Sequence, residues 1–169
     1  MASGRLLQAK RPVSVLAGPY GHPFHPIVVT VPIGAWVAAF VFDLASRFSD
    51  EPAPFVKGAC WLVGIGLLGA AAAALLGFLD LFAIPTGTRA FRTGLLHMAL
   101  NLAVVTLYTV SFLVRSGRLE RPGGVPAWLV ALSAGSLAVL AVSGWLGGRL
   151  AFRYGVRVAD EASQEQAYQ

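Results

Sequence analysis

Four long apolar stretches, separated by short polar segments, dominate the pattern of hydrophobic and polar positions along the chain. They cover residues 26–48, 58–82, 94–114 and 125–146. Each is close to the ~20 residues with which an α-helix crosses the hydrocarbon core of a bilayer. The segments between them contain Pro, Gly and charged residues, which are typical of turns. The pattern therefore predicts an all-α fold, a four-helix transmembrane bundle with up-and-down connectivity.

The distribution of basic residues predicts how the four spans are oriented. Eight Lys and Arg residues lie on the side that carries both termini, and five lie on the other side. Because cytoplasmic segments are enriched in Lys and Arg, this excess places both termini in the cytoplasm. The chain then divides into a cytoplasmic amino-terminal segment (1–25), a four-helix transmembrane domain (26–148) and a cytoplasmic polar tail (149–169).

Composition supports a membrane protein and narrows its chemistry. Hydrophobic residues make up 56% of the chain and charged residues 12%, which leaves too little polar surface to cover a soluble globule. The net charge of +5 comes from residues in the loops and termini, so it indicates topology and not nucleic-acid binding. A lone cysteine, Cys60, excludes an intramolecular disulfide and a cysteine-rich metal site. Ligands for a cofactor would have to be His, Met, Asp or Glu.

The second apolar stretch has one face of small residues. At 100° per residue these positions fall close together: Gly66, Gly69, Ala73, Gly77 and Asp80. Two interpretations stay open. The favoured one is that small residues allow a neighbouring helix to pack closely, and the other is that they form a slot for a flat cofactor.

Polar residues gather at the predicted cytoplasmic end of the spans. His22 and His25 flank the start of the first span, and His97 lies about one turn inside the third, which enters from the same side. We therefore expect the His25 and His97 rings to lie near one another at the same membrane depth. Rings more than about 15 Å apart could not share a metal ion, because its bonds to imidazole are only ~2 Å long. Asp80 ends the second span on this side, and Asn101 shares the helical face of His97.

Several kinds of chemistry could use this cluster. His25 and His97 on different helices could hold a b-type haem iron from both sides, with His22 as a substitute ligand and Asn101 nearby. The haem propionates would then pair with Arg92 or Arg149.

Three alternatives remain open for the same residues. A divalent transition metal could be held by a set of four ligands: His22, His25, Asp80 and His97. Asp80 beside an imidazole could instead pass protons or bind a small substrate. In the plainest interpretation, the histidines lie at headgroup level and Asp80 pairs with Arg89 or Arg92.

A second polar position, Asp43, lies 18 residues after His25, which is five turns along one helix. We expect it at the opposite end of the first span, roughly 27 Å from His25 at 1.5 Å per residue. A carboxylate inside a membrane needs a partner, and Lys57 and Arg115 are the candidates. Tyr108 could extend a sparse polar line from His97.

Four ordered blocks resemble a bacterial membrane-protein family known as domain of unknown function 2231. They are Gly21-His22-Pro23-Phe24-His25-Pro26, then Val31 to Gly34 with Asp43, then Asp80 with Ile84 to Thr88, Arg92, His97 and Asn101, and last Gly147-Gly148-Arg149 with Tyr154-Gly155. The resemblance implies a four-helix domain in the bacterial inner (plasma) membrane and brings no activity with it. Relatives joined to Rieske-type iron–sulfur modules favour membrane electron transfer.

From the residues and the resemblance together we expect a small integral membrane protein that binds haem b as a redox-associated subunit. The competing class is a non-catalytic structural or assembly subunit. Expected partners are the lipid bilayer, a membrane redox partner and a second copy of the chain, and no nucleic acid. Motifs of soluble enzymes, such as a phosphate-binding loop or His-Glu-x-x-His, are absent, so the sequence gives no support to soluble-enzyme chemistry and leaves open whether the protein is an enzyme.

Overall fold

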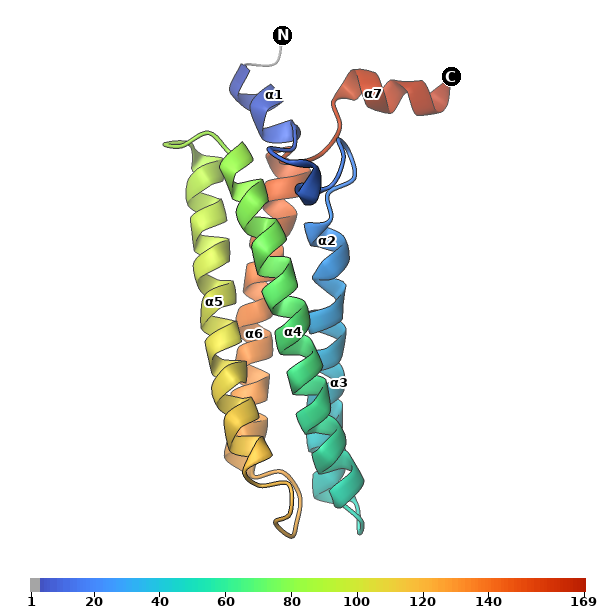
Figure 1. The fold of residues 1–169 in the computed structure, drawn as a ribbon, viewed down its shortest axis with the longest axis vertical. Helices are drawn as coiled ribbons and strands as arrows, with labels where there is room; N and C mark the ends of the chain where they lie inside the picture. The colour runs from blue at the N-terminus through green and yellow to red at the C-terminus, as the bar shows by residue number, and fades with distance from the viewer. Residues whose placement is uncertain (1–3) are drawn as a thin grey trace. The chain divides into compact units, whose positions relative to one another are not determined.

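A computed structural model describes residues 4–169, and helices account for most of them (Figure 1). Four segments are long and apolar enough to cross a membrane, as predicted. They consist of α2 (His25–Val28) with α3 (Thr30–Phe48), α4 (Ala53–Ala83), α5 (Arg89–Ser116), and α6 (Ala127–Gly148) with a π-helical turn, η2 (Arg149–Arg153). The described residues contain no β-strand, so the all-α prediction is confirmed.

Four short helices lie outside these spans. They are α1 (Gly4–Lys10) and η1 (Val15–Ala17) before the first span, and α7 (Glu161–Glu165) and η3 (Gln166–Tyr168) after the last. The predicted polar tail from residue 149 therefore begins inside a helix, because α6 continues through η2 to Arg153.

Two spans begin five residues earlier than the apolar pattern predicts, for local reasons. Helix α4 starts at Ala53 and includes Pro54 in its first turn, where a missing N–H costs nothing. Helix α5 starts at Arg89, because the Thr88 side chain caps it: its Oγ1 accepts a hydrogen bond of 3.1 Å from the Phe91 N–H.

The first span is interrupted at Val29, which separates α2 from α3. Pro32 lies three residues later and cannot donate a backbone hydrogen bond to the carbonyl of Val28. The missing donor at Pro32 accounts for the interruption of the helix at this point.

The chain forms two compact units, each built from parts of all four spans. The first comprises residues 4–27, 73–99 and 142–169, and the second comprises 28–72 and 100–141. Successive spans run alternately from one unit into the other, which is the up-and-down connectivity that the short loops predict.

In the second unit, the core is centred on an aromatic stack. The rings of Trp36 and Tyr108 lie 4.2 Å apart at 11°, and Trp36 Nε1 donates a hydrogen bond of 3.3 Å to the Val63 carbonyl. Gly66 makes room for this indole, since a Cβ there would overlap the ring. Gly69 in turn lies against Val31 and Pro32. In this unit the small-residue face of α4 serves close packing.

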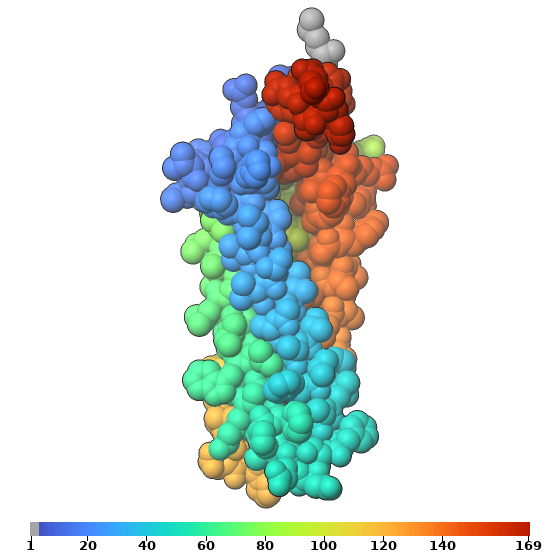
Figure 2. Space-filling model, turned by 90° about the vertical axis from the view of Figure 1, so that its right-hand side faces the viewer, coloured from blue at the N-terminus to red at the C-terminus, as the bar shows by residue number. Residues whose placement is uncertain are grey.

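In the first unit, the segments near the two termini pack together. The backbone N–H of Arg157 donates to the Ala9 carbonyl at 3.0 Å, and Ala9, Ile84 and Val156 form a small core. Figure 2 shows the amino-terminal residues (blue) beside the carboxyl-terminal residues (red) of this unit. The tail up to Val158 is thus part of the folded unit.

Candidate functional site: a histidine pair between helices

His25 begins α2 and its ring lies against α4. Its Nδ1 is 2.8 Å from the carbonyl oxygen of Ala73. The ring can approach α4 closely because Gly77 has no side chain: a Cβ there would be 2.9 Å from His25 Cε1. The prolines on either side of this histidine limit the backbone, so they help to fix where α2 begins.

His97 is held in the same way by α6. Its Nδ1 is 2.8 Å from the Ser143 carbonyl oxygen and 3.0 Å from Ser143 Oγ. Gly147, one turn later on α6, leaves the space that the ring needs, since a Cβ there would be 3.2 Å from His97 Cε1. Each imidazole is therefore hydrogen-bonded through Nδ1 to a main-chain carbonyl of a neighbouring helix, and its ring lies against a glycine of that helix.

The two imidazoles are close together within the first unit. Their ring centroids are 6.2 Å apart and the ring planes cross at 89°, so the predicted proximity of His25 and His97 is confirmed. A carbonyl oxygen can only accept, so Nδ1 of each neutral ring carries the hydrogen and Nε2 carries the lone pair. Nε2 is thus the atom of each neutral ring whose lone pair could bind a metal ion.

Asp80 takes a partner that the sequence analysis did not predict. Its Oδ1 lies 2.7 Å from Arg157 Nε, in an ion pair whose geometry does not make a hydrogen bond. The expected pairing with Arg89 or Arg92 is wrong, because the chain after α6 turns back and brings Arg157 to Asp80.

Arg157 is 3% exposed, adopts a positive φ of 61°, and donates from Nη2 to the carbonyls of Ala17 and Gly18 at 2.9 Å each. This arginine thus joins the end of α4, the segment before α2 and the tail. Sequence reasoning missed it because it lies in a segment assigned to the tail.

His22 is exposed on the loop before α2. The four residues predicted to ligate a divalent metal do not come together: within residues 4–169 no group of three or more His, Cys, Asp or Glu side chains is placed to hold an ion. Arg92 is exposed on α5, and Asn101 belongs to the second compact unit.

Arg149 lies at the end of α6 among aromatic side chains. Its guanidinium carbon is 4.8 Å from the centre of the Trp145 ring, and its Nη2 donates to Tyr154 Oη at 3.0 Å.

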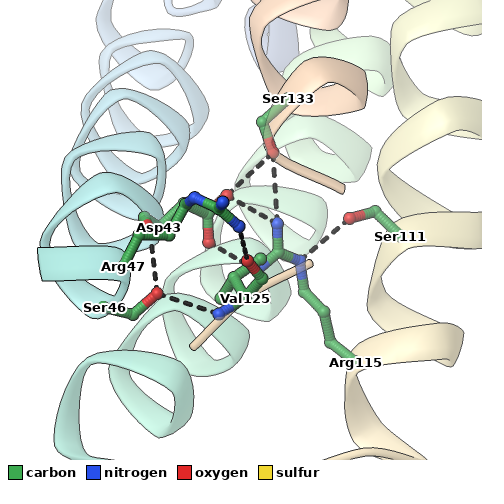
Figure 3. A network of polar contacts seen from close by, with 7 residues as sticks. All are labelled: Asp43, Ser46, Arg47, Ser111, Arg115, Val125 and Ser133. Atoms are coloured by element: carbon green, nitrogen blue, oxygen red, sulfur yellow. Dashed lines mark hydrogen bonds and ion pairs between the residues drawn. The ribbon is translucent and has the colours of Figure 1, made fainter. Parts of the chain in front are cut away.

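The second unit contains a separate polar cluster around Asp43 (Figure 3). Arg115 donates from Nη1 and Nη2 to the two carboxylate oxygens of Asp43, at 2.6 Å each. Ser133 Oγ donates to Asp43 Oδ2 at 3.0 Å, and Arg115 Nε donates to Ser111 Oγ at 2.9 Å. The predicted pairing of Asp43 with Arg115 is confirmed, while Lys57 lies 3.6 Å from Glu120 instead.

The same end of α3 is joined to the loop before α6. Ser46 Oγ donates to the Asp43 carbonyl and accepts from the Val125 N–H, at 2.7 and 3.0 Å. Arg47 Nη1 donates to the Val125 carbonyl at 3.0 Å (Figure 3). This cluster connects α3, α5, α6 and the loop before α6 through internal hydrogen bonds.

Four apolar spans with ionisable residues placed between helices define an integral membrane protein of the α-helical class. A family model described as predicted membrane protein (DUF2231) matches residues 21–160, and the chain belongs to this family. No curated protein and no solved structure matches the chain.

Proposed function

We propose that the protein binds a b-type haem in the membrane, with His25 and His97 as axial ligands, and acts as an electron-transfer subunit. The observation that carries the proposal is the histidine pair: two imidazoles from different helices with ring centroids 6.2 Å apart, each with Nδ1 hydrogen-bonded to a main-chain carbonyl.

The separation of the two rings suits a shared iron. Two iron–nitrogen bonds of about 2 Å and two ring radii of about 1.1 Å give centroids roughly 6 Å apart. The observed distance is 6.2 Å, and perpendicular ring planes, here at 89°, are compatible with axial ligation from opposite sides.

The surroundings of each ring support a ligand role. A hydrogen bond from Nδ1–H to a carbonyl fixes the tautomer and the ring orientation and makes Nε2 a better electron donor, as is usual for metal-binding histidines. The bonds to Ala73 and Ser143 supply this on both sides.

Haem also fits the number of ligands. The porphyrin gives iron four nitrogen atoms, so the protein has to provide only the two axial ligands. A haem with two histidines takes and releases single electrons, and its potential depends on the ligands and on the polarity around it. A redox partner in the same membrane would supply and accept these electrons.

The haem content of purified protein tests the proposal. We expect wild-type protein from haem-supplemented cells to contain haem, and His25→Ala and His97→Ala to lose it. His22→Ala is the matched control, because His22 is exposed, and it should retain full haem content. Wild-type protein without haem would refute the proposal, and metal analysis of the same samples would test the divalent-metal alternative.

The structure also favours a second function, a structural subunit without a cofactor. The Nδ1 bonds from His25 to α4 and from His97 to α6 join helices, whether or not iron is present. If this is their only role, His97→Ala will lower thermal stability while wild-type protein shows no haem absorption.

A further inference from the structure

We propose that the end of α6 binds the phosphate group of an anionic phospholipid, with Arg149 as the principal contact. This inference is independent of the proposed haem and concerns a different face of α6.

Arg149 differs from the two buried arginines, Arg115 and Arg157. Arg115 and Arg157 each lie against a carboxylate, Asp43 and Asp80 respectively. Arg149, by contrast, has no carboxylate within 4.0 Å among residues 4–169, and its buried Nε makes no hydrogen bond there. A guanidinium in a membrane-spanning segment needs an anionic partner, so a negative group from outside the chain fits this position.

The guanidinium is held in place from two sides. Its Nη2 donates to Tyr154 Oη. Its guanidinium carbon lies over the Trp145 ring, 4.8 Å from the ring centroid, within the range of a cation–π contact. A hydrogen bond with Thr93, followed by the bond from Arg149, lowers the pKa of the Tyr154 phenol, so both groups stabilise negative charge on that oxygen. Arg149 is thereby positioned before any ligand arrives, which reduces the entropic cost of binding.

The backbone at this position is unusual. Residues Arg149–Arg153 form a π-helical turn, a local widening of an α-helix that is rare and often occurs at functional sites. This turn directly follows Gly147 and Gly148, which belong with Arg149 to one of the sequence blocks that resemble the family. Of the two glycines, only Gly147 lies against the histidine pair.

The surrounding side chains favour a lipid over a free phosphate ion. Trp145 is 62% exposed and Phe152 is 92% exposed, so large aromatic side chains face outward on either side of Arg149 along the span. Trp beside Arg at the end of a span is typical of the interface between acyl chains and headgroups. A guanidinium can donate two parallel hydrogen bonds to one phosphate.

Arg149 and the contact with His97 lie on different faces of α6. Trp145 and Arg149 are four residues apart and share one face of α6, whereas Gly147 between them lies against His97. Arg149 therefore lies on a different face of α6 from the one that contacts His97, and we assign it to a phospholipid and not to a haem propionate.

Native mass spectrometry of the full chain in detergent tests this assignment, with phosphatidylglycerol as the anionic probe and phosphatidylcholine as the zwitterionic one. We expect preferential binding of phosphatidylglycerol, about tenfold weaker in Arg149→Gln. Arg149→Lys keeps the positive charge but cannot donate two parallel hydrogen bonds to one phosphate, so its affinity for phosphatidylglycerol should be intermediate. Arg121→Gln, an exposed arginine of the second unit, is the control and should bind as wild type.

Three results would overturn the proposal. Unchanged phosphatidylglycerol binding by both Arg149 variants would exclude the contact. Equal binding of the two lipids would exclude recognition of net negative charge, and competition by millimolar inorganic phosphate would indicate a site for the free ion. If Arg149→Gln does not fold, phosphatidylglycerol binding by Arg149→Lys and Trp145→Phe still tests the proposal. Trp145 is largely exposed, so its replacement by Phe should be tolerated.

Discussion

Asp43 and Arg115 are joined by two hydrogen bonds of 2.6 Å, with side chains that are 0% and 3% exposed. Such a pair is costly to bury and more costly to break, because removing one charge leaves the other without a partner in a medium of low dielectric constant. Each half comes from a different helix, α3 and α5, so the pair also fixes how these helices meet in the second unit.

Asp43→Asn should therefore lower the free energy of unfolding in detergent by about 3–5 kcal/mol. Ser111→Ala removes only the hydroxyl that accepts from Arg115 Nε, and we expect a loss nearer 1 kcal/mol. Unfolding at increasing denaturant concentration measures both. The double variant Asp43→Asn with Arg115→Met should regain part of the loss, and a double variant no better than Asp43→Asn alone would argue against an unpaired arginine as the cause.

Gly147→Ala should disturb the histidine pair. An added Cβ would lie 3.2 Å from His97 Cε1, so the ring has to shift. We expect a reduced haem content, or a changed absorption spectrum, in this variant. Gly144→Ala is a matched control on the same helix, since a Cβ at Gly144 would contact nothing within 4 Å. Equal effects of the two substitutions would show that helix flexibility, not contact with His97, is responsible.

The carboxyl-terminal segment should loosen in acid. The pKa of Asp160 lies below its usual value, chiefly because its carboxylate accepts a hydrogen bond from the Ser163 N–H and also accepts one from Tyr20 Oη. The stabilisation is fully present above the unfolded pKa near ~3.9 and is lost as pH falls through the lower folded pKa. Amide exchange of α7 between about pH 5 and 2.5 should report this loss.

Asp160→Asn should remove most of that pH dependence, and Tyr20→Phe should raise the pKa of Asp160 towards its usual value. Amide protection of α7 that is independent of pH in the wild type would mean that the Asp160 contacts do not hold this helix.

The topology prediction can be tested directly. Four spans and an excess of basic residues on the side of the termini predict that positions 118 and 160 lie on opposite sides of the membrane, with position 160 cytoplasmic. Reporter fusions after Arg118 and after Asp160 should give opposite signals. The same signal at both positions would be incompatible with four spans.

The spans and the histidine pair could be predicted because both can be recognised from the residues within single apolar stretches of the sequence. Apolar length identifies a span, and His97 stands out as a titratable residue inside one. Its place near His25 then follows from which ends of the spans share a side.

The partners of the other charges were harder to foresee, for different reasons. Asp43 had two candidate cations, Lys57 and Arg115, near the ends of the predicted spans, and only packing decides that Arg115 reaches it. Asp80 pairs with Arg157 because the chain reverses after η2, where Gly155 and Arg157 both adopt positive φ. The glycine at position 155 was the one local signal of that turn. The serines at 111 and 133 give no signal at all, since hydroxyls are common in membrane helices.

The central claim, a haem held by His25 and His97, is tested most directly by the electron paramagnetic resonance spectrum of the oxidised, purified protein. Two imidazole ligands predict low-spin ferric haem, and ring planes near the observed 89° predict a strongly anisotropic low-spin signal. His97→Ala should abolish that signal while His22→Ala leaves it unchanged. A high-spin signal in the wild type, or no haem signal after expression with added haem, would contradict the account.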